Sequence, residues 1–238
     1  MKTSLSQSVK KVIIFDAGAL ISFSMAGLLG LLAELKKEFN GKFLITSGVK
    51  GEIIDRPLKI KRFELEALRA KRLLDSKIIE LPDSVGVSDD EISKRTNEML
   101  DFANTLFKGN GKDVHIMDLG EASCLALSAI LRERGVESLI VIDERTTRML
   151  VEKPDNLRKF LGKKFHINIS VQKKNVDAFK DFQIIRSPEL AYIGYKKGLV
   201  RLKGALVLDA LLYALKFKGA SISDVEIEEM KKMARKKN

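Results

Sequence analysis

The chain is poor in the residues that form disulfides, thiolate metal centres and imidazole-based catalytic sites. Its 238 residues include one cysteine, Cys124, and two histidines, His115 and His166. A single cysteine excludes an intramolecular disulfide and a zinc centre built from several cysteines. Neither histidine lies in a recognisable motif with serine or cysteine, so a nucleophilic triad has little support. We expect Cys124 to lie in the core and both histidines to be structural.

Long apolar runs are also absent. No stretch approaches the roughly 20 apolar residues of a membrane helix, and the start, MKTSLSQSVKK, has no apolar segment typical of a signal peptide. We therefore expect a cytoplasmic protein with reduced thiols and no membrane partner. At 45% hydrophobic residues the chain can bury a full core. Its 32% charged fraction and abundant lysine are typical of heat-adapted proteins, which suggests a thermophilic source.

Aromatic residues are sparse, whereas positive charge is abundant and unevenly distributed. Residues 1–150 hold 23 Lys and Arg against 22 Asp and Glu, and residues 151–238 hold 20 against 10. Such an excess steers polyanions and contacts phosphates, although a Lys-rich surface is also common as a merely solvated face. The candidates for nucleic-acid binding are Lys163, Lys164, Lys173, Lys174, Lys196, Lys197, Arg201 and Lys203. Nothing indicates sequence readout, because no base-stacking positions can be identified.

Three acidic residues follow strands or begin a helix. Val12–Phe15 is an unbroken apolar run that ends at Asp16, and Leu139–Ile142 repeats this layout before Asp143. Such runs are typical of strands buried in a parallel sheet, whose carboxyl ends border the ligand crevice of open α/β folds. Glu121 lies in the first turn of a helix predicted over 120–134. The three carboxylates are therefore expected to face one crevice.

Each acid also has a purely structural interpretation. Asp16 fits a turn or cap residue, and Asp118 with Glu121 has the spacing of a capping box. Asp143 and Glu144 suit the cap of the next helix. A phosphatase of the haloacid-dehalogenase type would need a second Asp two positions after the first, and that position holds glycine. The combination of acids, rather than any one of them, indicates a site.

The chain closely resembles the PIN-domain nucleases over most of residues 10–150. The segments that carry the resemblance are DAGALISFSMAGLLGLL (16–32), ITSGVKGEI (45–53), GEASCLALSAI (120–130) and VIDERTTRML (141–150). SPELAYIGYKKGLV (187–200) and the segment 208–230 are similar to the carboxyl-terminal part of one subgroup. Two departures stand out: Ala17 replaces the Ser or Thr that follows the first Asp in many members, and 152–181 is longer than usual.

The resemblance implies a fold, a site and partners. The fold is a three-layer α/β/α sandwich with a central parallel sheet, whose catalytic acids match Asp16, Glu52, Glu121 and Asp143. The metal ligands would be Asp16, Glu121 and Asp143, with Asp118 and Glu144 in reserve. The activity is cleavage of single-stranded RNA with one or two divalent ions, and a toxin nuclease of the VapC type would have an antitoxin as partner.

The chemistry suits these residues. Hard cations such as Mg²⁺ or Mn²⁺ prefer carboxylate oxygen, and a bound ion lowers the pKa of its water enough for attack on phosphorus. The hypothesis is a metal-dependent ribonuclease, either a toxin or an RNA-processing enzyme. The alternative is a non-catalytic PIN domain that binds RNA through its basic half.

The architecture is expected to have a catalytic core over 10–150 and a basic part over 151–238 that completes the sheet. The completing strand is expected near 182–186, and 165–171 is predicted to pair with it as a β-hairpin bordering the insertion 152–181. Ser223 and Glu226 form a capping box for the last helix. The apolar helix near 205–217 suits either packing on the sheet or a homodimer contact.

Overall fold

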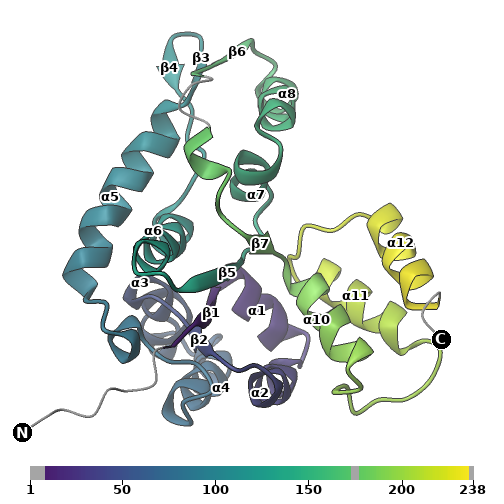
Figure 1. Ribbon diagram of the computed structural model, residues 1–238. Helices are drawn as coiled ribbons and strands as arrows, with labels where there is room; N and C mark the ends of the chain where they lie inside the picture. Colours follow the sequence, from purple (N-terminus) through teal and green to yellow (C-terminus); the bar gives the residue numbers. More distant parts are fainter. Residues whose placement is uncertain (1–8, 173–176, 236–238) are drawn as a thin grey trace, which may run out of the picture.

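The computed structural model describes residues 9–172 and 177–235, and its centre is a four-stranded parallel sheet (Figure 1). In spatial order the strands are β2 (Lys42–Leu44), β1 (Lys11–Phe15), β5 (Glu137–Val141) and β7 (Ile184–Ile185). In this register Ile14 lies opposite both Leu44 and Ile140. The last four residues of β1 are buried, as expected for a strand covered on both faces.

Helices flank the sheet, which is consistent with a three-layer α/β/α fold. On one side lie α3 (Ser47–Lys50), α5 (Asp89–Thr105) and α6 (Leu119–Glu133). On the other side lie α1 (Ala17–Met25), α2 (Leu29–Glu38), α4 (Glu64–Asp75) and α10 (Ser187–Lys196). Helix α6 packs on β1 and β5 beneath α5, and its residues from Ala122 to Leu131 are all buried. An apolar surface on every side of a helix is what such enclosure requires.

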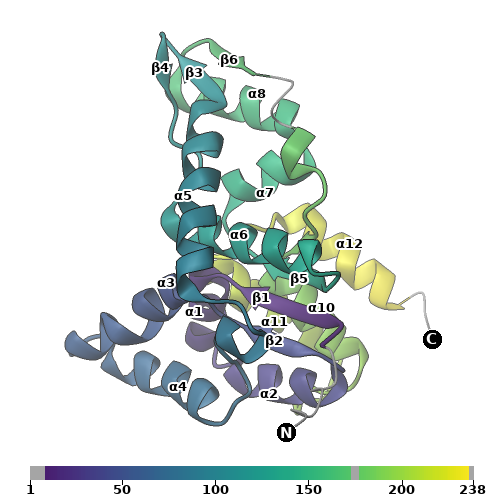
Figure 2. The same cartoon turned by 60° about the vertical axis from the view of Figure 1, so that its left-hand side comes forward.

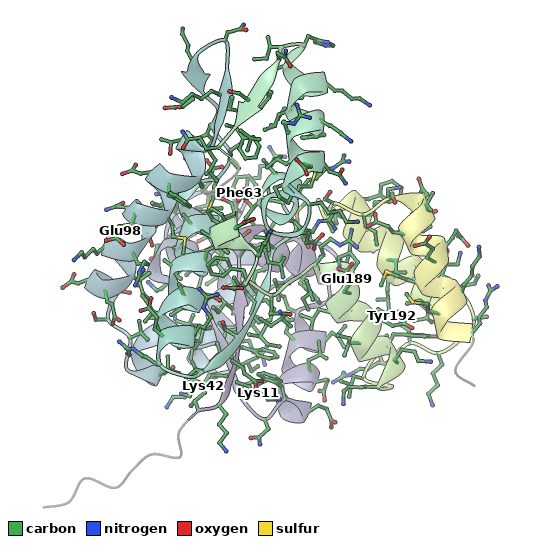
Figure 3. All side chains as sticks on the ribbon, turned by 45° about the horizontal axis from the view of Figure 1, so that its top comes forward. Lys11, Lys42, Phe63, Glu98, Glu189 and Tyr192 are labelled. Carbon is green, nitrogen blue, oxygen red and sulfur yellow. The ribbon has the colours of Figure 1, made fainter. Side chains whose placement is uncertain are left out.

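The strands point in one direction, so their amino ends share one edge of the sheet. Lys11 and Lys42, the first residues of β1 and β2, lie together at this edge in Figure 3. Asp16 follows β1 at the opposite edge. The acids that follow the strands are therefore gathered at the carboxyl edge, away from this pair of lysines.

One strand within the predicted insertion, β6, belongs to a second, antiparallel sheet, and the predicted β-hairpin is wrong. β6 (Ile169–Val171) pairs with β3 (Phe107–Gly109), which also pairs with β4 (Lys112–Asp113). β7 instead joins β5 in parallel, where Ile184 and Ile185 extend the apolar sheet. Figure 2 shows α5 running from the parallel sheet to this antiparallel sheet. β6 and β7 therefore each pair with the edge of a different sheet, although they are close in sequence.

Two helical segments are interrupted. α1 and α2 are separate helices, because Gly27 adopts a positive φ of 71° between them. Glu52 lies in a π-helical turn over Gly51–Asp55, and Pro57 then begins a 3₁₀ turn before α4. The second interruption is the one that a proline imposes.

The carboxyl-terminal helices have a small core of their own. They are α10, α11 (Val207–Phe217) and α12 (Asp224–Arg235). α11 packs against α10 and α12, and its Leu215 reaches the main core, whereas Leu206 just before it is 79% exposed. The capping box before α12 is confirmed, since Ser223 and Glu226 exchange backbone-to-side-chain hydrogen bonds.

None of the helices in residues 9–172 and 177–235 is, by itself, long and apolar enough to cross a membrane. The pair α1 and α2 meets that criterion jointly, by length and composition, but is bent by 116°.

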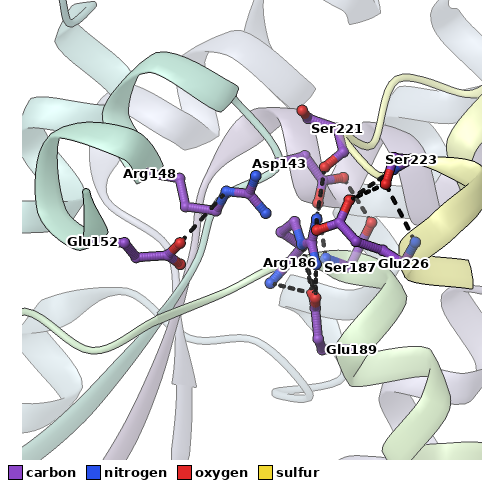
Figure 4. A network of polar contacts seen from close by, with 9 residues as sticks. All are labelled: Asp143, Arg148, Glu152, Arg186, Ser187, Glu189, Ser221, Ser223 and Glu226. Atoms are coloured by element: carbon purple, nitrogen blue, oxygen red, sulfur yellow. Dashed lines mark hydrogen bonds and ion pairs between the residues drawn. The ribbon is translucent and has the colours of Figure 1, made fainter. Parts of the chain in front are cut away.

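Helix α7 (Arg145–Glu152) and helix α8 (Pro154–Phe165) connect the two sheets. Near α7, Arg186 attaches the carboxyl-terminal helices to the end of β7 (Figure 4). Its Nε lies 2.7 Å from Glu189, and its Nη1 donates to Glu226 at 2.8 Å and to the Ser221 carbonyl at 2.9 Å. Two carboxylates therefore neutralise this buried cation.

Phe179, which precedes β7, packs against α5 and supplies a test of the fold. Its ring is 1% exposed and lies 5.8 Å from the ring of Phe102, centroid to centroid. Phe179→Ala is expected to lower the free energy of unfolding by about 3–5 kcal/mol, because it removes a buried ring and leaves a cavity. Urea denaturation measures this. Phe165→Ala is the control, since that ring is 44% exposed and its removal should cost under about 1 kcal/mol.

Candidate functional site

The strand order reverses between β1 and β5, and this position forms the switch point of the sheet. The chain moves from β1 to β2 in one direction, and β5 and β7 lie on the other side of β1. Asp16 follows β1 directly, and its backbone N–H donates to the Val141 carbonyl at 3.0 Å. In open α/β sheets such a point forms the ligand crevice. Asp16 and Asp143 follow the two strands that meet at this point.

Asp16 is a buried acid that also caps a helix. Its side chain is 4% exposed, and Oδ2 accepts a hydrogen bond from the Gly18 N–H at 3.0 Å. Burial raises its pKa to about 7, and the negative charges of Glu121 and Glu52 contribute to that rise. Hydrogen bonds from Gly18 and Ala17 oppose it. The structural interpretation as a cap is therefore correct, and an acid that titrates near neutrality is a site candidate in addition.

Gly120 leaves open a space between two of the predicted acids. A Cβ atom at this position would lie 3.2 Å from Glu52 Oε1 and 3.4 Å from Asp16 Oδ1. Both carboxylates therefore border the same point at the start of α6. The pKa of Glu52 is raised, mainly by burial, although Arg56 opposes the shift. Sequence reasoning assigned no role to Gly120; its position directly before Glu121 was the available signal.

Glu121 completes the group of acids and also stabilises its own helix. Its Oε2 accepts a hydrogen bond from the Asp118 N–H at 2.9 Å, so the predicted capping-box contact is present. Burial raises the pKa of Glu121, and the charges of Asp118 and Glu144 raise it further. Asp16, Glu52 and Glu121 form one interacting cluster of carboxylates, which we call the acid cluster.

Asp143 lies at the same end of the sheet, but its oxygens are engaged by α10. It is 3% exposed, with Oδ1 accepting from the Ser187 N–H at 2.7 Å and Oδ2 from the Ser187 hydroxyl at 2.6 Å. Glu144, rather than Asp143, caps α7 by accepting from the Thr147 N–H at 2.7 Å. Ser187 is a partner that the sequence did not reveal, because it lies far along the chain. The role of Asp143 in metal binding remains a prediction.

No three His, Cys, Asp or Glu side chains among residues 9–172 and 177–235 stand in an arrangement that could already hold a metal ion. The reason is visible in two of the acids. One oxygen of Glu121 is occupied by a backbone N–H, and both oxygens of Asp143 are occupied by Ser187. A cation at the acid cluster would therefore have to draw these side chains toward itself.

The predicted RNA-binding cations lie in two separate regions (Figure 1). Lys163 and Lys164 stand in the last turn of α8, whereas Lys196 and Lys197 stand at the end of α10, before Arg201 and Lys203. Lys196 donates to the Ala234 carbonyl at 3.2 Å. Lys173 and Lys174 lie outside the described residues. The described candidates therefore form no single surface patch.

The remaining polar candidates agree with structural roles. Cys124 is fully buried, and its thiol donates to the Phe15 carbonyl at 3.7 Å. His115 Nε2 lies 2.7 Å from Asp118 Oδ1, and His166 ends α8 in the left-handed conformation. The expectation that Cys124 belongs to the core is confirmed.

Comparison with protein-family models, curated proteins and solved structures found no match to this chain.

Asp16→Asn should change the pH dependence of stability in a metal-free buffer. The folded carboxyl holds its proton up to a pH of about 7, whereas the unfolded one releases it near 3.8. The charge of Asp16 therefore destabilises the fold increasingly as the pH rises through this window, by about 4 kcal/mol at its upper end. Asp16→Asn should become more stable than the native protein as the pH rises from 4 to 8.

Urea denaturation in EDTA at a series of pH values measures this difference. Asp75→Asn is the matched control, because Asp75 is exposed and paired with Lys71. A constant difference between Asp16→Asn and the native protein across the range would contradict the assignment.

Proposed function

We propose that this protein is a PIN-type, divalent-metal-dependent ribonuclease that hydrolyses phosphodiester bonds of single-stranded RNA, as a toxin or an RNA-processing enzyme. The observation that carries the proposal is the acid cluster at the switch point of a parallel sheet. Asp16 and Glu52 border one open space at Gly120, and Glu121 raises the pKa of Asp16. Carboxylates gathered at that position favour the binding of a cation.

The donor set suits Mg²⁺ or Mn²⁺. All the candidate ligands are carboxylates, which hard cations prefer, and neither histidine belongs to the cluster. Asp16, Glu121 and Asp143 would hold the ion, with Glu144 in reserve. When bound, the ion supplies a water of lowered pKa and neutralises charge on the phosphate oxygens.

The protein's own groups would position the metal-binding carboxylates and deprotonate the attacking water. The Gly18 N–H would hold Asp16 Oδ2 in position. Glu52 would accept the proton of the attacking water, because its carboxyl is only half-buried and its pKa is raised. Ser187 would orient Asp143 through its two hydrogen bonds.

A cleavage assay tests the proposal. Labelled single-stranded RNA should be cut with Mg²⁺ or Mn²⁺ and not with EDTA. Asp16→Asn and Glu121→Gln should each reduce the rate by on the order of a hundredfold or more, as expected when one group acting on the transition state is lost. These variants are preferable to Asp143→Asn, which also disturbs two buried hydrogen bonds to Ser187.

Asp75→Asn is the control, and it should cut at the native rate. Equal cutting by the native protein and Asp16→Asn would identify a contaminating nuclease and sink the proposal. Tight RNA binding by native protein without cutting would favour a non-catalytic RNA-binding module instead.

The open space at Gly120 can be tested without removing any acid. Gly120→Ala adds a methyl group 3.2 Å from Glu52 Oε1 and should displace the carboxylates. We expect cleavage to fall by about 10–100-fold, the effect of small misplacements at a reacting centre. Gly51→Ala is the matched control, since a Cβ there meets no atom within 4 Å. Native rates in both variants would show that the space has no part in the reaction.

A further inference from the structure

A polar cavity lies between α7, the start of α8 and the end of β7. Its volume is about 330 Å³. Its charged lining consists of Arg145, Arg148, Glu152, Lys153, Arg186, and the pair Glu189 and Glu226. None of the acid cluster lines it. None of the proposed catalytic steps uses it.

One of the arginines in this cavity is fully neutralised. Arg186 binds the carboxylates of Glu189 and Glu226 and the carbonyl of Ser221 (Figure 4). These contacts account for two of the three carboxylates in the lining. The lining as a whole has four cations and three carboxylates, a net charge of +1.

Arg148 is the least satisfied of these cations. Its side chain is 14% exposed, and its Nε is buried without a hydrogen-bond partner among the described residues. The ion pair of this Nε with Glu152 spans 4.0 Å. Burial and the neighbouring charge of Arg186 lower the pKa of Arg148, which means that its positive charge is held at a cost. A buried donor of this kind calls for an acceptor.

Two further cations, Arg145 and Lys153, line the cavity. The guanidinium of Arg145 stacks on Phe160 at 4.8 Å, an arrangement that leaves its in-plane N–H donors free. Neither Arg145 nor Lys153 forms an ion pair within the described parts of the chain. An anion entering the cavity would therefore displace no existing salt bridge of these two side chains.

The start of α8 contributes a third cation to the cavity. Lys153, the N-cap of this helix, and Asn156 of its first turn line the cavity.

We propose that this cavity binds a phosphate group, held by Arg148 and Arg145 with support from Lys153. Four cations and three carboxylates leave one net positive charge, which a phosphate carrying one negative charge balances. Guanidinium groups match phosphate oxygens through paired N–H donors. The group belongs either to the end of a nucleic acid strand or to its backbone. The proposal does not depend on the acid cluster being catalytic.

Calorimetric titration with inorganic phosphate, in EDTA, tests the site apart from any cleavage. Arg148→Gln should weaken phosphate binding about tenfold or more, and Arg145→Gln should also weaken it, because each removes a charge-assisted contact. Arg95→Gln is the matched control, since Arg95 pairs with Glu133 on the surface of α5. Equal affinity in the native protein and Arg148→Gln, or no phosphate binding by the native protein, would overturn the proposal.

Competition identifies the source of the phosphate. A short single-stranded RNA with a 5′-phosphate that displaces inorganic phosphate, when the same RNA with a 5′-hydroxyl does not, assigns the cavity to a strand end. Displacement by both assigns it to the backbone, and displacement by neither shows that the cavity is not a nucleic-acid site. If Arg148→Gln unfolds, Arg148→Lys repeats the test; a lower melting temperature with unchanged phosphate affinity would reveal a purely structural arginine.

Discussion

Parallel pairing of β1 with β2 and β5 is the constraint on which the rest of the molecule depends. It brings the carboxyl ends of these strands to one edge, where Asp16 directly follows β1 and the chain beyond β5 reaches Asp143. Helix α6, enclosed between the sheet and α5, then adds Glu121 at its first turn. Because the core fixes all three backbones, the acids cannot separate when they repel one another. Burial is the largest cause of the raised pKa values of Asp16 and Glu121, and the charges of neighbouring acids add to it.

That arrangement has an energetic cost that the fold must offset. A buried acid with a pKa of about 7 destabilises the charged protein by about 4 kcal/mol, a large share of the roughly 5–15 kcal/mol that stabilises a typical domain. The capping contacts of Asp16 and Glu121 recover part of the cost. Structural and functional interpretations of these acids are therefore compatible, because the same carboxylates hold helices in place and create the field that favours a cation.

The carboxyl-terminal segment contributes both to the parallel sheet and to the polar cavity. β7 adds the fourth strand, Ser187 holds Asp143, and Arg186 gathers Glu189 and Glu226. The cavity around Arg186 and Arg148 has four cations and three carboxylates, a net charge of +1. A ligand that carries phosphates would suit this charge and the buried Nε of Arg148, which has no hydrogen-bond partner among the described residues.

Features that depend on neighbouring residues could be predicted from the sequence: the apolar runs of β1 and β5, the acids that follow them, and the capping boxes at Asp118 and Ser223. Apolar periodicity and caps act over a few residues, so they can be recognised along the chain. The pairing of β6 with β3, the hold of Ser187 on Asp143 and the approach of two carboxylates to Gly120 arise only in the folded chain. These contacts join segments far apart in the chain, and the packing of the whole core selects them.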